Sequence, residues 1–212
     1  MKDNEKQTKF TILVAMFISI QIVMTLIPFL GFIPIFAVNI TTLHIPTILA
    51  GILLGVKGGA IVGASFGLMS ITNATIRPGL TSFLFSPFAP APAGFSGNPL
   101  SLVIALLPRI LLGVIAAFLY QYLKNKQWKV AAAGVAAVIA TLLHTLMVLS
   151  LIFIIFSEPY AAALNLDGPH AVLAVLGTIV TTNGIFEAVL AGVTMTLFVA
   201  ALEPIVKKMV SK

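Results

Sequence analysis

The sequence predicts an all-α integral membrane protein with six transmembrane helices and both termini in the cytoplasm. Its 212 residues are 59% hydrophobic and only 8% charged, with a mean hydropathy of +1.13. A soluble domain of this length needs a far more polar surface. Ten of the twelve Lys and Arg residues also fall in alternate gaps between apolar segments, and short cytoplasmic loops accumulate such residues. These ten are Lys2, Lys6, Lys9, Lys57, Lys124, Lys126, Lys129, Lys207, Lys208 and Lys212.

Each predicted helix is an apolar stretch close to the ~20 residues that one membrane crossing requires. The six cover residues 9–29, 38–56, 58–75, 100–123, 129–156 and 171–203. The second and third are separated by the short run LGVKGG. A lysine within the bilayer costs about 2.5–3.5 kcal/mol, so Lys57 favours a reversal over one long stretch with a glycine kink. The first segment is too long for the apolar part of a signal peptide. It is therefore expected to be retained as the first helix, and residues 1–212 are expected to form a single membrane domain.

Two predicted outer loops differ from ordinary solvated loops, and both are expected to be ordered. Residues 30–37, LGFIPIFA, are apolar and are expected at the membrane interface. Residues 76–99 combine many Pro and Gly residues with Phe83, Phe85 and Phe88, which predicts an irregular cap. Two interpretations of this cap remain open. It is a lid over a binding site, since long irregular loops tend to be functional, or an interfacial anchor, since aromatic residues are common at that depth.

Two charged residues fall inside predicted helices. Arg109 lies about 14 Å into the fourth helix, and Glu187 lies in the inner half of the sixth. Charges at such depths face the bundle interior or a wet cavity and mark candidate functional sites. One interpretation is a structural Arg109–Glu187 ion pair. The other makes Arg109 the receptor for an anionic group, since guanidinium binds carboxylate through two hydrogen bonds. Pro108 is expected to free a backbone carbonyl towards the same cavity.

Polar residues also gather in the outer halves of the predicted helices, namely His44, Asn73, His144 and Asn183. Asn183 precedes Glu187 by four residues, so the two share one helix face. Taken singly, each is explained more simply by a hydrogen bond between helices, worth about 0.6 kcal/mol on average. Their convergence beneath the phenylalanine-rich loop predicts a cavity for a small polar organic molecule.

Several functions are excluded by what the sequence lacks. It contains no Cys, which rules out disulfides and thiolate metal sites. The run GILLGVKGG lacks the GK[ST] ending of a phosphate loop, and no metalloprotease or serine hydrolase motif occurs. We therefore expect no enzyme activity, no cofactor and no metal. The net charge of +6 reflects the cytoplasmic lysines and favours anionic lipid head groups over nucleic acid.

Small residues recur at helical spacing in two places, which indicates close helix packing. On the first predicted helix, Ala15 and Ser19 form a short small-residue face suited to docking another membrane protein. Five glycines recur at every fourth position across the second and third predicted helices: Gly51, Gly55, Gly59, Gly63 and Gly67.

Three runs of the sequence carry a family resemblance: TTLHIPTILAGILLGVKGGAIVGASFGLMS, TSFLFSPF and SGNPLSLVIALLPRILLGV. They resemble the substrate-binding S components of energy-coupling factor vitamin importers, and the pantothenate-specific branch in particular. The resemblance implies six helices in a prokaryotic plasma membrane and a high-affinity vitamin site capped by the outer loops. It also implies partners, namely one transmembrane coupling protein and two ATPase subunits that hydrolyse the ATP. Docking to the coupling protein is implied at the small-residue face of Ala15 and Ser19.

Pantothenate suits the polar residues found above. Its carboxylate suits Arg109, its hydroxyls and amide suit Asn and His, and its gem-dimethyl group suits Phe. Pyridoxine, a hydroxymethyl-pyrimidine and folate remain alternative substrates within the family. A structural or sensory membrane protein and an autonomous ion-coupled transporter are alternatives outside it. The expected substrate-binding residues are Arg109, Asn73, His44, Phe83, Phe85, His144, Asn183 and Glu187.

Overall fold

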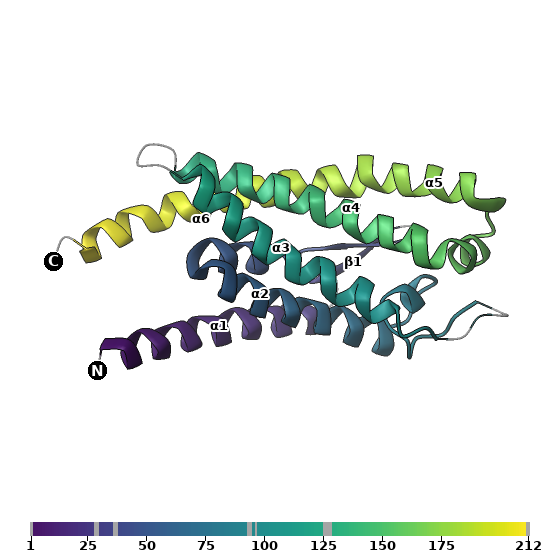
Figure 1. The fold of residues 1–212 in the computed structure, drawn as a ribbon, viewed down its shortest axis with the longest axis horizontal. Helices are drawn as coiled ribbons and strands as arrows, with labels where there is room; N and C mark the ends of the chain where they lie inside the picture. The colour runs from purple at the N-terminus through teal and green to yellow at the C-terminus, as the bar shows by residue number, and fades with distance from the viewer. Residues whose placement is uncertain are drawn as a thin grey trace.

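The protein is an elongated bundle of helices that run along one common axis (Figure 1). The computed structural model describes residues 2–27, 30–35, 38–92, 95, 97–124 and 129–210. Within them the helices are α1 (Lys2–Leu26), α2 (His44–Ile76), α3 (Ser101–Leu123), α4 (Lys129–Leu164), α5 (Gly168–Ile179) and α6 (Ile185–Val210). In the described residues, 5 helical stretches are long and apolar enough to cross a membrane. The prediction of a helical membrane protein is confirmed at that level.

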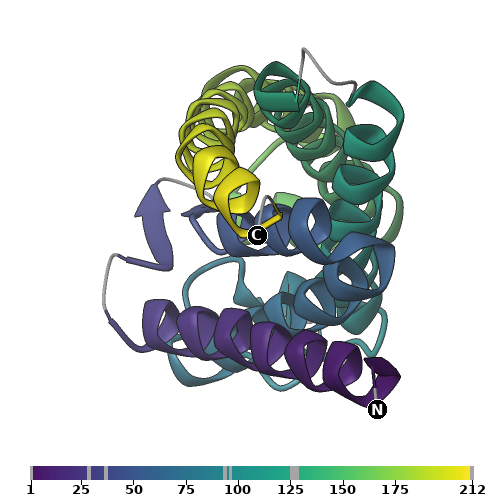
Figure 2. The same ribbon diagram turned by 90° about the vertical axis from the view of Figure 1, so that its left-hand side faces the viewer.

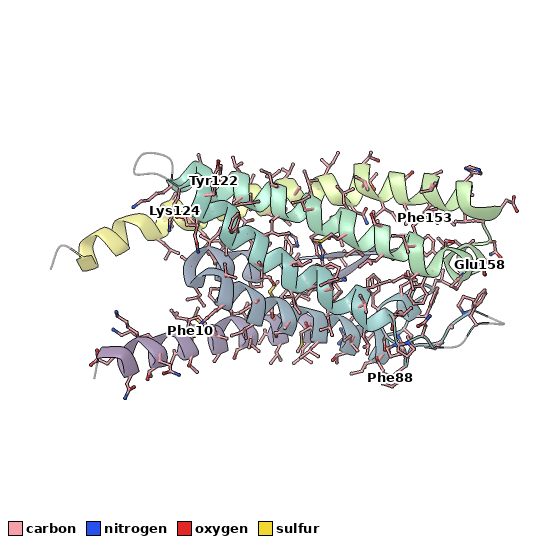
Figure 3. All side chains as sticks on the ribbon, viewed as in Figure 1. Phe10, Phe88, Tyr122, Lys124, Phe153 and Glu158 are labelled. Atoms are coloured by element: carbon pink, nitrogen blue, oxygen red, sulfur yellow. The ribbon has the colours of Figure 1, made fainter. Side chains whose placement is uncertain are left out.

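The two ends of the bundle differ in what they carry. The N- and C-termini lie at one end, which we name the terminal end, and the chain between α2 and α3 lies at the other, the loop end (Figure 1). Tyr122 and Lys124 lie towards the terminal end, whereas Phe88 and Glu158 lie at the loop end (Figure 3). This arrangement agrees with lysines gathered on one side of a membrane and the aromatic loop on the other.

Helix α2 reverses direction at Gly55, where φ is 75° and ψ is −169°. A Cβ placed on Gly59 would lie 3.0 Å from the Cα of Gly51. Residues eight apart in one continuous helix are about 12 Å apart, so the arms 44–54 and 56–76 fold back on each other. Lys57, next to the reversal, is exposed, as the cost of burying its charge predicts.

A short antiparallel β-hairpin precedes α2 and corrects the prediction of a helix from residue 38. Strands β1 (Phe32–Ile35) and β2 (Val38–Thr41) pair with Phe32 opposite Thr41. Thr42 closes the hairpin by donating its backbone N–H to the Gly31 carbonyl at 3.1 Å. The strands FIPI and VNIT are rich in the apolar and β-branched residues that favour strands. The hairpin lies on one flank of the bundle, between α1 and α6 (Figure 2).

Other elements also differ from the predicted ones. Helix α4 extends to Leu164, beyond the predicted end at 156, through a kink at Phe156 (φ −129°). The last predicted helix is divided into α5, the π-helical turn η2 (Val180–Gly184) and α6. The loop 76–99 contains a short 3₁₀ turn, η1 (Ser82–Leu84). Side-chain hydrogen bonds order this loop, since Thr75 and Ser86 pair through their hydroxyls at 2.7 Å.

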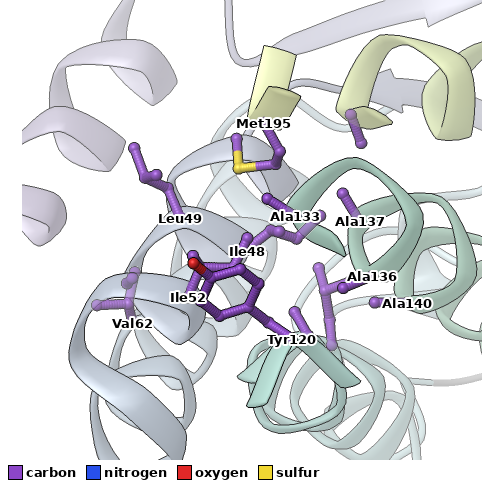
Figure 4. Close-up of a cluster of buried hydrophobic side chains, with 14 of the residues drawn as sticks. Ile48, Leu49, Ile52, Val62, Tyr120, Ala133, Ala136, Ala137, Ala140 and Met195 are labelled. Carbon is purple, nitrogen blue, oxygen red and sulfur yellow. The ribbon is translucent and has the colours of Figure 1, made fainter. Parts of the chain in front are cut away.

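In the core, small side chains on one helix pack against larger side chains from its neighbours. In the close-up, Ala133, Ala136, Ala137 and Ala140 of α4 present a small-residue face towards the larger side chains of the cluster (Figure 4). Those larger side chains include Ile48, Ile52, Tyr120 and Met195. A second buried cluster near the loop end contains Phe83, Phe156 and Tyr160. The two clusters fix the positions of the helices that carry the candidate site.

Candidate functional site

A cavity opens between the β-hairpin, the second arm of α2, the η1 loop, α3, α4 and the α5–η2–α6 segment. Six of the eight predicted substrate-binding residues line it: Arg109, Asn73, Phe85, His144, Asn183 and Glu187. The remaining lining residues are Phe32, Thr41, Ser70, Ala74, Thr81, Ser82, Thr145, Val148, Leu149, Ile179 and Gly184. Apolar walls with a few convergent polar groups are typical of sites for small organic ligands.

Arg109 is buried, with 4% of its surface exposed, and one of its terminal nitrogens is held by the backbone. Its Nη1 donates to the carbonyl oxygen of Ile104. That carbonyl lies four residues before Pro108, which has no N–H to offer it. The predicted release of a carbonyl by Pro108 is therefore present. The Arg109 Nε has no hydrogen-bond partner in the described part of the chain, so the guanidinium retains donor capacity for a ligand.

Two aromatic rings flank the Arg109 guanidinium. Its Cζ lies 5.0 Å from the ring centroid of Phe85 and 5.5 Å from that of Phe66. Contacts in this range are cation–π interactions, which strengthen when the cation is removed from water. Guanidinium is more weakly hydrated than ammonium and stacks well on rings. The rings thus help to keep a charge in a buried position without neutralising it.

Glu187 is held by the hairpin rather than by Arg109. The backbone N–H of Thr41 donates to its Oε1 at 2.7 Å, which joins α6 to the end of β2. Among the residues that the structure describes, no ion pair joins Arg109 to Glu187. This geometry favours the interpretation in which Arg109 receives an anionic group. Both charges face one cavity, and each has a separate backbone partner.

Several buried polar atoms at the cavity lack partners. Both ring nitrogens of His144, the hydroxyl of Thr145 and the hydroxyl of Ser70 form no hydrogen bond within the described residues. Buried polar groups in proteins are nearly always hydrogen-bonded, and leaving one unsatisfied costs about 1–3 kcal/mol. A ligand with hydroxyl and amide groups would supply the missing partners.

Two of the predicted residues lie outside the cavity lining. His44 is 1% exposed and its Nδ1 lies 2.5 Å from the Thr41 carbonyl oxygen, behind the hairpin. Phe83 is 3% exposed and packs edge-on against Phe156, with ring centroids 6.2 Å apart. Depth along the chain placed both near the site, but the direction of each side chain is set by packing.

In the aromatic loop, one phenylalanine fits the lid interpretation and another fits the interfacial-anchor interpretation. Phe85 lines the cavity over Arg109, as a lid residue would. Phe88 is 77% exposed and projects at the loop end (Figure 3), as an interfacial anchor would. Ser86 between them is fully buried and fixes the loop by accepting the Phe88 N–H at 3.2 Å.

Two residues close to Arg109 were not predicted from the sequence. Phe66 and Ser70 precede Asn73 by seven and three residues, a spacing that places all three on one helix face. That spacing was a usable signal, because Asn73 was already a candidate. The hairpin residue Phe32 offered no such signal, since its segment was not expected to form a strand.

The predicted docking residues lie on the open face of α1. Ala15 and Ser19 are both exposed. At the loop end, Arg77 ties α1 to α2 by donating to the carbonyl oxygens of Thr25 at 3.3 Å and Leu26 at 3.1 Å. Helix α1 therefore offers a free surface while its far end is fixed to the bundle.

The sequence matches a known family over most of its length. A model of the ECF transporter substrate-specific component matches residues 9–199. The chain belongs to this family. It is 38% identical over 191 residues to "Pantothenic acid transporter PanT" of Lactococcus lactis subsp. cremoris, with 90% of this chain and 91% of the relative covered. It is 29% identical over 213 residues to "Pantothenate transporter PanT" of Leuconostoc mesenteroides subsp. mesenteroides, with 97% of both covered.

As an ECF substrate-specific component, the chain is a multi-pass cell membrane protein with a role in transport rather than catalysis. Every residue that lines the cavity falls within the matched range 9–199. The resemblance drawn from the three sequence runs is thus confirmed. An S component needs a site for its substrate, and the buried cavity around Arg109 has the composition of one.

Proposed function

We propose that this S component is the high-affinity pantothenate-binding subunit of an ATP-driven ECF importer. The observation that carries the proposal is the guanidinium of Arg109, buried in the cavity with donor capacity that no ion pair among the described residues consumes. An anionic ligand group would complete it. The names of the two relatives support pantothenate as that ligand.

The chemistry of pantothenate fits the groups around Arg109. Its carboxylate would receive the free donors of the guanidinium, beside the Phe85 ring. Its amide and hydroxyls would pair with the amides of Asn73 and Asn183 and with the ring nitrogens of His144. A hydroxyl of the pantoyl part would donate to the oxygen of Glu187 that Thr41 leaves free. Its gem-dimethyl group would pack on the apolar wall.

The alternative vitamins of this family fit less well. Pyridoxine and a hydroxymethyl-pyrimidine carry no carboxylate and would leave the Arg109 charge unpaired, which is costly in a buried site. Folate is larger and carries more negative charge than the single Arg109 in the cavity would balance. These compounds therefore serve as the comparison ligands in the test below.

Transport itself is proposed to require partners. One transmembrane coupling protein and two ATPase subunits would supply the energy, with docking at the Ala15 and Ser19 face. In this proposal the chain crosses the membrane six times, with the two arms of α2 counted separately and both termini in the cytoplasm. The substrate would then bind from the outside, through the loop end of the bundle, and would be released inward when the S component topples in the membrane.

Calorimetry on the isolated, detergent-solubilised chain tests the substrate. Pantothenate is expected to bind tightly, whereas pyridoxine, the hydroxymethyl-pyrimidine and folate are not. Uptake into liposomes is expected only when the coupling protein and both ATPases are present with ATP. Absence of pantothenate binding, or uptake by the chain alone, would overturn the proposal.

Docking is tested separately from binding. An Ala15→Leu substitution is expected to abolish uptake by the assembled importer and to leave pantothenate affinity unchanged, since a bulky residue prevents close helix approach. Ala162→Leu, at another exposed position on α4 near the loop end, is the matched control and should affect neither. Normal uptake by the Ala15 variant would contradict this assignment.

A further inference from the structure

The helix turn before Arg109 contains an unusual exchange of hydrogen-bond partners. In a regular α-helix the N–H of residue 108 would donate to the carbonyl of Ile104. Pro108 has no N–H, and its ring crowds that same carbonyl. The carbonyl instead accepts from Nη1 of Arg109, one residue further along. We propose that Pro108 is a positioning residue that fixes the direction of the Arg109 guanidinium towards the carboxylate of the substrate.

Because the Ile104 carbonyl is buried, the Arg109 guanidinium is its hydrogen-bond donor in place of water. Ile104 is 0% exposed and Arg109 is 4% exposed, so water does not compete for the carbonyl. A buried carbonyl without a partner is costly, and the guanidinium is the donor that satisfies it. With Nη1 engaged there, the planar fork is fixed on one side, and the buried Nε, which lacks a described partner, is left as an unsatisfied donor.

The flanking rings restrict the remaining freedom of the guanidinium. Phe66 and Phe85 approach its Cζ at 5.5 and 5.0 Å. They limit lateral movement, but a ring face does not set which nitrogen points where. The Ile104 carbonyl supplies that direction, and Pro108 leaves the carbonyl free to do so. Pro108 is therefore assigned a role through Arg109, without contact to the substrate.

A Pro108→Ala substitution separates this role from a structural one. The backbone at position 108 would regain an N–H, the ring would no longer displace the carbonyl, and the regular helical bond would form. Helix α3 would then be more regular, so thermal stability is expected to stay equal or to rise. The guanidinium would meanwhile lose its fixed acceptor, so recognition of the carboxylate is expected to weaken. A purely structural proline would not produce this opposite pair of effects.

Helix α4 offers a matched control. Pro159 also lies inside a transmembrane helix, and Tyr160 rather than an arginine follows it. Pro159→Ala therefore makes the same chemical change without an exchange of the kind seen at Arg109. Its effect on stability measures what loss of a helix proline does in this bundle, and its effect on carboxylate recognition is expected to be nil.

The readout is the ratio of affinities for pantothenate and for the analogue in which a primary alcohol replaces the carboxylate. This inference rests on the proposed function, because it needs Arg109 to receive the carboxylate. Wild-type protein is expected to prefer the acid strongly. Pro108→Ala is expected to lower that preference about tenfold, the size of one charge-assisted hydrogen bond, through weaker acid binding alone, whereas Pro159→Ala keeps the wild-type ratio.

Each outcome is decisive. An unchanged ratio in folded Pro108→Ala protein, or an equal loss for both ligands, overturns the role of Pro108 while the proposed function stands. Wild-type protein that binds neither ligand overturns the proposed function and this inference with it, whereas wild-type protein that binds both equally overturns the pairing of Arg109 with the carboxylate and this inference. Pro108→Gly, which also restores the N–H, is expected to lower the ratio in the same way and replaces the Ala variant if that protein does not fold.

Discussion

Arg109 and Glu187 line one buried cavity, and each is held by a backbone group instead of by the other. The Ile104 carbonyl accepts from Arg109, and the Thr41 N–H donates to Glu187 at 2.7 Å. Opposite charges that share a cavity without pairing leave both available to a third group. A ligand with an anionic end and a hydroxyl-bearing end would complement the two together.

Removal of the Arg109 charge is expected to weaken pantothenate binding by at least about 30-fold, because truncating one partner of a buried charged pair costs about 2–5 kcal/mol. Calorimetry on Arg109→Gln measures this. Arg77→Gln removes a guanidinium that bonds only to the end of α1 among the described residues and should bind normally. Equal affinities for the two variants would contradict the role of Arg109.

Substitution of both charges tests whether they brace the fold. Thermal unfolding of Arg109→Gln, Glu187→Gln and the double variant should give a coupling energy well below the ~3–5 kcal/mol that breaking a buried contact ion pair costs. Glu187→Gln keeps an oxygen that can accept the Thr41 N–H. A coupling of several kcal/mol would restore the ion-pair interpretation and count against this geometry.

Two phenylalanines of the aromatic loop should differ in their contribution to pantothenate affinity. Phe85→Ala is expected to weaken pantothenate binding about two- to thirtyfold, since a desolvated cation–π contact is worth about 0.5–2 kcal/mol. Phe88→Ala should leave affinity unchanged, because that side chain is 77% exposed and faces away from the cavity. If the two variants bind alike, Phe85 is not part of the site.

Close packing of α2 on α3 should depend on Gly63. A Cβ at this position would lie 2.3 Å from the carbonyl oxygen of Arg109, so Gly63→Ala is expected to destabilise the protein by about 1–3 kcal/mol through overpacking. Gly177 is the matched control, since a Cβ there would meet nothing within 4 Å. Gly177→Ala should be neutral or raise the unfolding temperature slightly. A stable Gly63 variant would mean that the helices separate at little cost.

Much of the site followed from the sequence because charge and depth constrain a membrane helix strongly. Arg109 and Glu187 had to face inward, since lipid does not tolerate them. Asn183 followed from its four-residue spacing to Glu187. The reversal next to Lys57 followed from the cost of burying its ammonium, and the freed Ile104 carbonyl followed from Pro108.

The remaining features depend on packing that a single sequence does not determine. His44 and Phe83 lie at the expected depth, but neither lines the cavity, since His44 contacts the Thr41 carbonyl and Phe83 packs against Phe156. The hairpin was missed because the sequence between the two strands is Phe36-Ala37, which lacks the Asn-Gly or Asp-Gly pair that predicts a hairpin turn. For the same reason the backbone contact of Thr41 with Glu187 was not foreseen.

The most direct test of this account is a calorimetric titration of pantothenate and its alcohol analogue into the isolated wild-type chain. Pantothenate is expected to bind tightly and the alcohol much more weakly, because only the acid pairs with Arg109. Equal affinities for the two compounds, or no binding of either, would contradict it.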